Sequence, residues 1–532
     1  MPRGAVLSGY AAWAPFTYKA FAVIWIATVV SNIGGWMYSA AAGWLMTDLT
    51  TDPLLVSLVQ VANTLPLFMF ALPAGALTDI VDRRKLLIAG EAANTIVPGI
   101  FAVMVWTNHV SATSLLVFMF LIGVFGTLTS PAWQAVTPEL VPKSSLSAAI
   151  SWNSVGVNVS RAIGPALAGA IIGPLGIAAP FVVDAVSNLG VNAAIVWWRE
   201  PKKPTSGLPV ERFGGALRLG FRYARNNPAL GSTLGRCVAF FLFASSYWAL
   251  LPLVARNQIH AGPQIYGILL GAIGLGAVGG SFALPKLKER IGPDRLVGVA
   301  SIGTAIALVL FGVAREPLVA LVACIMAGVS WIVAIATLNV SAQVALPDWV
   351  RGRGLAIYIT VMFGAMTLGS ALWGEFAAVA GLPLAHFASA AALLLAIPLS
   401  WRWKLQRGAQ FDLTPSMSWP PPIVSDDVEV DASDGPVLVT VEYRLAGEES
   451  REPFLANLTW LRRERLRDGA FAWGIFEDTA KRGRFLETFE VDSWAEHLRQ
   501  HERVTHADEA VQQNIRTLLA ADSIVTHYIS PS

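Results

Sequence analysis

The chain has 532 residues, of which 54% are hydrophobic and only 14% are charged. A soluble globular protein carries about 25% charged residues, so this composition excludes a soluble enzyme of this length. With a mean hydropathy of +0.55, the sequence predicts an integral membrane protein.

Twelve apolar stretches are long enough to cross a bilayer as helices, which takes about 20 residues each. They run approximately over residues 17–45, 54–78, 85–106, 112–133, 147–172, 176–198, 232–255, 264–285, 295–314, 317–344, 354–380 and 383–401. We predict an all-α polytopic membrane protein with two six-helix bundles, in residues 1–198 and 232–407. A cytoplasmic linker, residues 199–231, separates them.

Lysine and arginine gather in alternate loops. With a cytoplasmic N-terminus, 22 of them fall on the inner side, and only Arg256 and Arg315 fall in outer loops. Because inner loops carry the excess of positive charge, we expect a multi-pass protein of the cell (inner) membrane with both termini in the cytoplasm. The linker reads as a basic amphipathic helix that lies on membrane lipid, and a regulatory role is the alternative.

The two halves share a short motif. Residues 137–146 align without gaps on residues 346–355, and both lie between the fourth and fifth helices of their half. Internal six-helix repeats are typical of secondary transporters. We therefore predict a 6+6 pseudo-repeat.

The loop after the second helix contains Gly75, Asp79, Arg83 and Arg84. It resembles the gating motif of the major facilitator superfamily, with Ile80 and Asp82 in place of an Arg and a Gly. The resemblance implies that Asp79 meets the start of the eleventh helix near Gly354, where free amides and the helix dipole favour a carboxylate. The alternative is simple inner-side charge, which explains the arginines but not the Gly and Asp.

Further motifs narrow the resemblance to drug and siderophore exporters described as transmembrane secretion effectors. These motifs are Trp44 with residues 49–53, residues 138–142, residues 164–169 and residues 351–353. The similarity covers about residues 15–405. The fourth helix lacks the Arg that many proton-coupled drug antiporters place there.

Gly164, Pro165 and Gly169 resemble the antiporter motif of the fifth helix. Glycines four or five residues apart allow close helix packing, and proline bends the helix. Ordinary small-residue packing is the alternative reading.

Ionisable residues inside spanning helices are costly and usually functional. Four are candidates for proton coupling: Glu91, Asp184, Glu375 and Arg161. In the alternative, Arg161 and Asp184 form a structural ion pair. The resemblance also implies a cavity lined by the first, fourth, seventh and tenth helices, with an aromatic and uncharged wall suited to an amphipathic organic molecule. Its candidates are Asn32, Trp36, Gln134, Tyr247, Trp331 and Asn339.

Charge changes sign near the end of the chain. Residues 1–424 hold 26 Lys and Arg against 15 Asp and Glu, whereas residues 425–532 hold 12 against 21. A Pro-rich and acidic linker, residues 408–435, precedes a soluble domain at residues 436–532. We expect this acidic domain to dock electrostatically on the basic inner loops.

The soluble domain has the pattern strand, helix, strand, strand, helix, which is the ferredoxin-like order. It resembles the antibiotic-biosynthesis-monooxygenase type of α+β domain, which implies dimerisation. His497 and His501 lie four residues apart, a spacing that can bind zinc. We expect a solvated or interface pair instead, and no metal or other cofactor.

Together these features predict a transporter that exports small amphipathic organic molecules, drugs or siderophores, by proton-coupled antiport. No catalytic residue and no nucleic-acid partner is expected, and no phosphate-binding P-loop motif occurs. The alternatives are a membrane-tethered monooxygenase-like enzyme fused to a transporter, an importer, or a lipid flippase.

Overall fold

A computed structural model describes residues 13–198, 213–406, 412–416, 419, 422–425 and 429–530. Within these residues, twelve helices are long and apolar enough to cross a membrane, as predicted. They are α2 (Lys19–Leu49), α3 (Pro53–Ile80), α4 (Arg83–Trp106), α5 (Ala112–Leu140), α6 (Leu146–Leu175), α7 (Ala179–Trp197), α9 (Pro228–Leu253), α10 (Pro263–Arg290), α11 (Pro293–Val313), α12 (Pro317–Val344), α13 (Arg351–Ala380) and α14 (Leu382–Ser400).

The helix ends follow local capping chemistry. Asp52 caps α3 by accepting a hydrogen bond from the Leu54 amide at 2.9 Å, and Pro53 supplies the first helical residue. Asp82 caps α4 by accepting from the Lys85 amide at 2.9 Å. The side chain of Asp82, which replaces a glycine of the expected motif, therefore begins the helix that carries Arg83 and Arg84.

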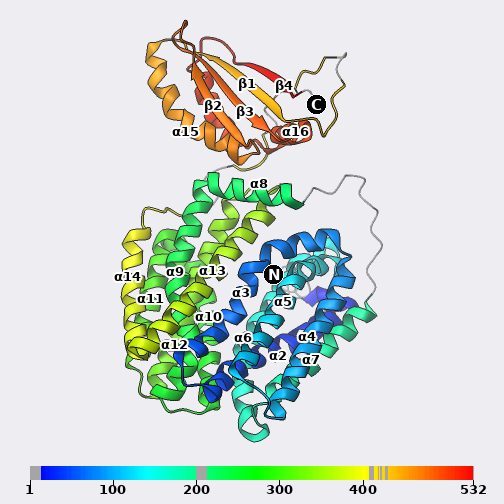
Figure 1. The fold of residues 1–532 in the computed structure, drawn as a ribbon, viewed down its shortest axis with the longest axis vertical. Helices are drawn as coiled ribbons and strands as arrows, with labels where there is room; N and C mark the ends of the chain where they lie inside the picture. The colour runs from blue at the N-terminus through cyan, green and yellow to red at the C-terminus, as the bar shows by residue number, and fades with distance from the viewer. Residues whose placement is uncertain are drawn as a thin grey trace, which may run out of the picture. The chain divides into compact units, whose positions relative to one another are not determined.

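The chain divides into two compact units. The first contains residues 1–208, 234–339 and 358–403, and the second contains residues 209–233, 340–357 and 404–532. In the first unit, α2 packs on α6 and α7, α3 on α5, α4 on α5 and α7, and α11 on α14, while α6 packs on α10 (Figure 1). Successive helices reverse direction, so one end of this unit carries the turn at residues 50–52 and the other carries residues 81–82. We call these the Asp52 end and the Asp82 end.

The second unit contains a four-stranded antiparallel sheet in the order β2-β3-β1-β4. Its elements are β1 (Val437–Arg444), α15 (Arg451–Arg467), β2 (Ala472–Glu477), β3 (Arg484–Val491), α16 (Trp494–Arg503), α17 (His506–Arg516) and β4 (Ile524–Ile529). Val437, Val439, Val441 and Tyr443 of β1 are buried with Phe454 of α15 in one core. The alternation that predicted β1 therefore reflects one buried and one open face.

The linker helix α8 (Phe213–Asn226) belongs to this second unit and contacts α15. Arg222 Nη1 donates a hydrogen bond to the Gly469 carbonyl at 2.6 Å. The Tyr223 ring meets the Trp349 ring edge-on at 5.6 Å, and the Arg503 guanidinium lies 4.4 Å from the Trp349 centroid. The described contacts of this region thus include a hydrogen bond from Arg222 to a neutral carbonyl and an arginine over an aromatic ring. Charge alone had led us to expect contacts between acidic and basic side chains here.

Candidate functional site

A cavity of about 700 Å³ lies among the first six spanning helices. It extends from Phe21 and Leu140, near the Asp82 end, to Tyr38 and Met119 deeper in the bundle. Its wall combines amides, indole rings and two carboxyl groups, contributed by Asn32, Asn63, Asn94, Gln134, Asn153, Asn188, Trp25, Trp36, Trp133, Glu91 and Asp184. The structure thus brings together five predicted site residues, namely Asn32, Trp36, Gln134, Glu91 and Asp184.

Asp184 of α7 is only 4% exposed and is held by neutral groups. Asn188, one turn later, donates to Asp184 Oδ1 at 3.3 Å and to the Asn94 carbonyl at 3.1 Å. Ser31 of α2 donates to Asn188 Oδ1 at 2.6 Å. Residues four apart share one helix face, so a single amide joins the acid to two other helices.

Close packing of α2 on α7 positions this network. A Cβ on Gly34 would lie 2.5 Å from Ser187 Oγ and 2.9 Å from Asp184 Cα. Any side chain at this position would therefore force α2 away from α7. Gly34 is required because the backbone of Asp184 approaches it directly.

Glu91 of α4 is the second carboxyl group in the cavity and is 6% exposed. Trp133 of α5 donates its indole N–H to Glu91 Oε1 at 2.7 Å. Among the described residues, no ion pair joins Glu91 or Asp184 to a cation. Sequence reasoning missed Asn188 and Trp133, since polar residues in apolar helices signal a site only once the helix faces are known.

Arg161 does not form the ion pair with Asp184 that we considered. The described residues contain no such pair, and the Arg161 guanidinium lies 5.4 Å from the centroid of the Trp36 ring. Arg161 Nε has no hydrogen-bond partner in the described part of the chain. The indole ring of Trp36 on α2 contacts the Arg161 guanidinium, because α6 presents residue 161 toward Trp36.

The other predicted residues lie elsewhere. Glu375 is exposed near the end of α13 and does not line the cavity. Asn339 is exposed on α12, outside the cavity as well. Tyr247 and Trp331 are 1% and 7% exposed and pack into an aromatic cluster with Phe241 and Trp248, among others. These two rings fill the interior of the second six helices and do not line the described cavity.

The antiporter-like motif lies where the two sets of helices meet. A Cβ on Gly169 would lie 2.5 Å from the Pro263 carbonyl oxygen, and one on Gly267 would lie 2.4 Å from the Pro165 carbonyl oxygen. Gly164 faces α2 instead, where a Cβ would lie 2.6 Å from Trp36 Cβ. Gly169 and Pro165 therefore form a backbone-to-backbone contact between α6 and α10.

A second contact joins α3 and α13. Thr64 Oγ1 and Thr367 Oγ1 share a hydrogen bond of 2.8 Å, and a Cβ on Gly364 would lie 2.8 Å from Phe68 Cδ2. A Cβ on Gly374 would overlap the hydroxyl of Ser57. Glycine again sets the helix separation.

The Asp52 end carries further contacts between these two sets of helices. Arg256 pairs with Asp48 and donates to Thr47 Oγ1 at 2.9 Å. Its guanidinium lies 5.6 Å from the Trp44 ring, which also meets Tyr266 at 5.8 Å. The described contacts thus run from the Asp52 end to mid-helix, whereas the cavity extends toward the Asp82 end.

The gating motif is only partly described. The side chain of Asp79 lies outside the described residues, and so does its predicted contact near Gly354. Arg83 Nη1 lies 3.8 Å from Glu139 Oε1. Arg84 donates to the carbonyls of Trp198 and Val196 at 3.1 and 2.8 Å. Arg84 therefore satisfies the carbonyl end of α7, where a cation is favoured by the helix dipole.

In the second unit, His497 Nε2 and His501 Nε2 lie 3.4 Å apart on α16. The described residues contain no group of three His, Cys, Asp or Glu side chains that could hold a metal ion. The two rings pack edge to face at 5.0 Å, but His497 is 1% exposed and His501 is half-buried, so the pair is not the solvated one that was one of the two expectations.

The family described as transmembrane secretion effector matches residues 10–531. The staphyloferrin A transporter of Staphylococcus aureus is 24% identical over 357 residues, which are 66% of this chain and 87% of that protein. The enterobactin exporter EntS of Citrobacter koseri is 24% identical over 369 residues, which are 68% of this chain and 86% of that protein.

Solved structures resemble the chain as well. A bacterial homolog of the human lysosomal transporter Spinster, inward-facing and unoccupied, matches with a TM-score of 0.57 at 15% identity, over 73% of this chain and 97% of that one. A bacterial homologue of the iron transporter ferroportin, inward-facing, matches with a TM-score of 0.55 at 16% identity, over 72% of this chain and 98% of that one. These likenesses show the fold.

Proposed function

The chain belongs to the transmembrane secretion effector family of the major facilitator superfamily, and on that premise we propose that it exports small amphipathic organic molecules by alternating access in exchange for protons. Like its named relatives, it is a membrane transporter and not an enzyme. Those relatives are named for staphyloferrin A and enterobactin, which makes a siderophore-type cargo the first to test.

The cavity among the first six helices is the observation that supports this function. Its volume of about 700 Å³ falls in the range of about 300–1,000 Å³ that holds small organic ligands. Indole rings and amides on its wall suit a molecule with aromatic and polar parts. Asp184 and Glu91 add carboxyl groups that no described cation neutralises.

Alternating access follows from the glycine contacts. The α6–α10 contact joins backbones without interlocking side chains, and at the α3–α13 contact Gly364 and Gly374 face single side chains of α3 beside one Thr64–Thr367 hydrogen bond. One set of helices can therefore rock on the other around mid-helix. The positive charge of the inner loops supports placing the Asp82 end in the cytoplasm. The cavity would then open inward, and the Arg256–Asp48 pair would close the outer side.

Proton coupling is assigned to Asp184, with Glu91 as its partner acid. Asp184 is buried and lines the cavity proposed to hold the cargo. Its direct described hydrogen bond comes from the neutral amide of Asn188, so the acid can exchange a proton without breaking an ion pair. Arg161, half-buried against the cavity residue Trp36, would disfavour a cationic occupant.

The soluble domain is proposed to be ferredoxin-like and to dimerise. Its order β1-α15-β2-β3-α16-α17-β4, with sheet order β2-β3-β1-β4, supports the βαββαβ arrangement. The open face of the sheet exposes Phe476, Leu486, Ile524 and Tyr528. An apolar sheet face of this kind fits a second copy of itself.

Export can be tested in proteoliposomes with an imposed pH gradient, enterobactin as the probe cargo and an entrapped pH dye. We expect Asp184→Asn to lower gradient-driven transport and coupled proton flux by about tenfold or more, a ratio worth about 1.4 kcal/mol. Glu375→Gln is the matched control, because Glu375 is exposed outside the cavity. Unchanged proton flux in Asp184→Asn would refute the assignment.

A further inference from the structure

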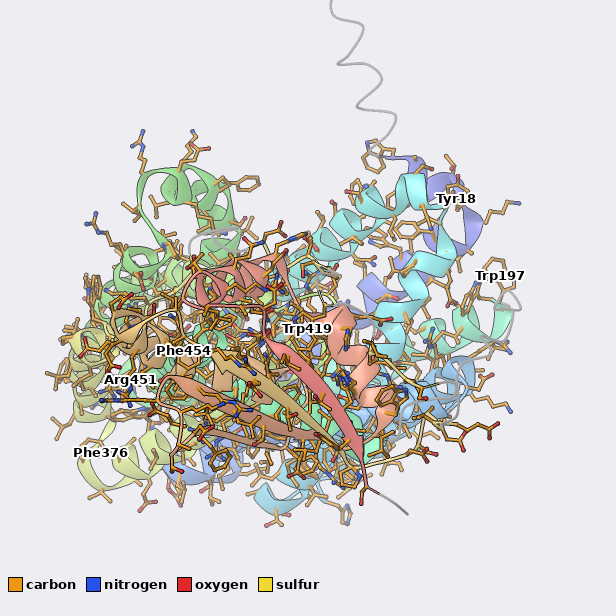
Figure 2. The ribbon with its side chains drawn as sticks, turned by 90° about the horizontal axis from the view of Figure 1, so that it is seen from above. Tyr18, Trp197, Phe376, Trp419, Arg451 and Phe454 are labelled. Carbon is orange, nitrogen blue, oxygen red and sulfur yellow. The ribbon has the colours of Figure 1, made fainter. Side chains whose placement is uncertain are left out.

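The side-chain amide of Asn188 joins Asp184 to two other helices, and both of its polar atoms have partners. Asp184 and Asn188 lie one turn apart on α7, the helix that ends at Trp197 (Figure 2). Asn188 Nδ2 donates to Asp184 Oδ1 at 3.3 Å and to the Asn94 carbonyl at 3.1 Å. Its Oδ1 accepts from Ser31 Oγ at 2.6 Å. Asn188 is only 7% exposed, so solvent has little access to these bonds.

A proline in α4 explains why the Asn94 carbonyl is free to accept this bond. Pro98 lies four residues after Asn94 inside α4, and proline has no N–H to donate to the carbonyl one turn earlier. A helix carbonyl without a donor is costly inside a membrane protein, and Asn188 supplies the missing donor. The sequence of α4 therefore fixes one N–H of Asn188 toward this carbonyl.

Ser31 of α2 opposes the flipped orientation of the amide. Its hydroxyl donates to Asn188 Oδ1. If the amide were flipped, its oxygen would face Asp184 Oδ1 and the Asn94 carbonyl, which are both acceptors. Three helices thus set one orientation, and in that orientation the second N–H points at Asp184.

The two carboxyl oxygens of Asp184 are not equivalent. Oδ1 accepts from Asn188, and it lies against α2, since a Cβ on Gly34 would be 3.2 Å from it. A protonated carboxyl group has one O–H donor, and its other oxygen remains an acceptor. Because Oδ1 faces an N–H donor, it is the acceptor in both protonation states, which leaves Oδ2 to carry the proton.

Two other titratable groups lie near Asp184. Glu91 of α4 and Tyr38 of α2 line the same cavity and interact electrostatically with Asp184. Neither is a cation, and no ion pair joins Arg161 of α6 to Asp184 among the described residues. In this part of the chain, Asn188 is thus the side chain whose hydrogen bond stabilises the ionised form of Asp184.

We propose that Asn188 is a positioning residue for proton exchange, which holds Asp184 Oδ1 as a permanent acceptor and sets the pH at which Oδ2 binds and releases the proton. The inference rests on the proposed coupling through Asp184 and adds the residue that controls it. Only the Oδ2–H bond forms and breaks in this step, and the proton comes from solvent and returns to it.

The test follows the carboxylic-acid C=O stretch of the full chain in lipid nanodiscs, without cargo, by difference infrared spectroscopy across a pH series. The band of Asp184 is the one that Asp184→Asn removes. In Asn188→Leu we expect this band to persist to a pH about 0.5–1 unit higher, because the carboxylate loses one net hydrogen bond. Its frequency should also rise, since the C=O group at Oδ1 loses its donor.

Each outcome of the titration bears on a separate statement. An unchanged midpoint in Asn188→Leu would overturn the control by Asn188, and an unchanged frequency would overturn the assignment of the proton to Oδ2. If wild type shows no band that Asp184→Asn removes, Asp184 carries no proton and the proposed coupling fails as well. If the band shifts as expected but wild type does not export in exchange for protons, the proposed function fails alone.

Asn192→Leu is the matched control. Asn192 lies one turn after Asn188 and donates to Thr95 Oγ1 at 2.9 Å, and no described side-chain contact joins it to Asp184. We expect the Asp184 band to keep its wild-type midpoint and frequency in this variant. An equal shift would assign the effect to a general loss of polarity in α7 and overturn the proposal.

Asn188→Ser replaces Asn188→Leu if the leucine variant does not fold. A serine hydroxyl can bond to the carbonyl one turn earlier in its own helix, so it suits a polar position without restoring the amide donor. We expect a shift to higher pH here too, and a wild-type midpoint would refute the role of Asn188.

Discussion

The first six spanning helices and the second six differ in the partners of their buried charged residues. The first set keeps Asp184 and Glu91 on a cavity with neutral hydrogen-bond donors. The second set pairs Arg236 with Asp294 at 3.0 Å, and Arg236 also donates to the Trp403 carbonyl at 2.8 Å. One set thus keeps carboxyl groups on a cavity without a described countercharge, while the other neutralises its buried charge inside a packed interior.

The largest difference should appear when one carboxylate is removed from each set. Asp294→Asn leaves Arg236, which is 2% exposed, without its countercharge, so we expect a loss of about 3–5 kcal/mol in the free energy of unfolding. Asp184→Asn should cost under about 1 kcal/mol, because it removes no described ion pair. Denaturant titration in mixed micelles measures both, and equal losses would erase the contrast.

Tryptophans give the next largest difference. Trp331 packs in the ring cluster of the second set, and its replacement by Ala should cost about 3–5 kcal/mol. Trp36 is only half-buried on the cavity wall, so Trp36→Ala should mainly weaken the apparent affinity for cargo. Melting curves and transport KM separate the two effects. A Trp36→Ala variant that melts as early as Trp331→Ala would contradict the division.

The contact between the two sets can be tested at Gly169. A methyl group there would lie 2.5 Å from the Pro263 carbonyl oxygen, so Gly169→Ala should cost about 1–3 kcal/mol as overpacking and slow transport. Gly190→Ala in α7 is the control, since a Cβ at Gly190 meets no atom within 4 Å. Stability and transport rate are measured together. Normal transport in Gly169→Ala would show that the contact between α6 and α10 at Gly169 does not change during transport.

The smallest effect concerns Glu464 of the soluble domain, where an acid is buried beside its cation. Burial raises its pKa from 4.5 to about 8, so the folded state binds the extra proton and its stability falls as pH rises toward 8. Histidines with lowered pKa values, among them His497, oppose this trend only below about pH 6.5. Between pH 6.5 and 8 we expect the domain to lose about 1–2 kcal/mol.

Glu464→Gln should flatten that decline, because glutamine keeps the contact with Gln512 and does not titrate. The other charged groups near Glu464 are Arg465, Asp468, Arg467 and Asp508, and they remain in the variant. Thermal melts followed by circular dichroism across this pH range provide the measurement. An identical slope in wild type and variant would assign the pH dependence to another group.

Sequence patterns were sufficient for most of the elements and for part of the candidate site. Apolar runs predicted the twelve spanning helices. Alternation predicted β1, and two further segments were predicted as the strands β2 and β3. The strand β4 was missed, since Ile524–Ile529 shows no buried face in the sequence: several of its residues are exposed at the sheet edge. Asp184 and Glu91 were found because charge inside an apolar helix is visible without a structure.

Partners between helices could not be predicted. The rotation of each helix decides whether Arg161 meets Asp184 or Trp36, and apolar spanning helices give little amphipathic signal to fix it. The same ambiguity placed Tyr247 and Trp331 on the cavity wall, although they pack among other rings. Amide donors such as Asn188 become recognisable only when neighbouring backbones are known.

The contact of α8 with the soluble domain also constrains the order of assembly. Tyr223 is 2% exposed, and its cover comes from Trp349 and from Arg467, whose guanidinium lies 5.9 Å from its ring. Arg467 leaves the ribosome well after Tyr223, by about 10–50 s at a synthesis rate of about 5–20 residues per second. During that interval the Tyr223 ring lacks the cover that Arg467 supplies, so a nascent or truncated chain exposes more of this aromatic side chain than the finished one.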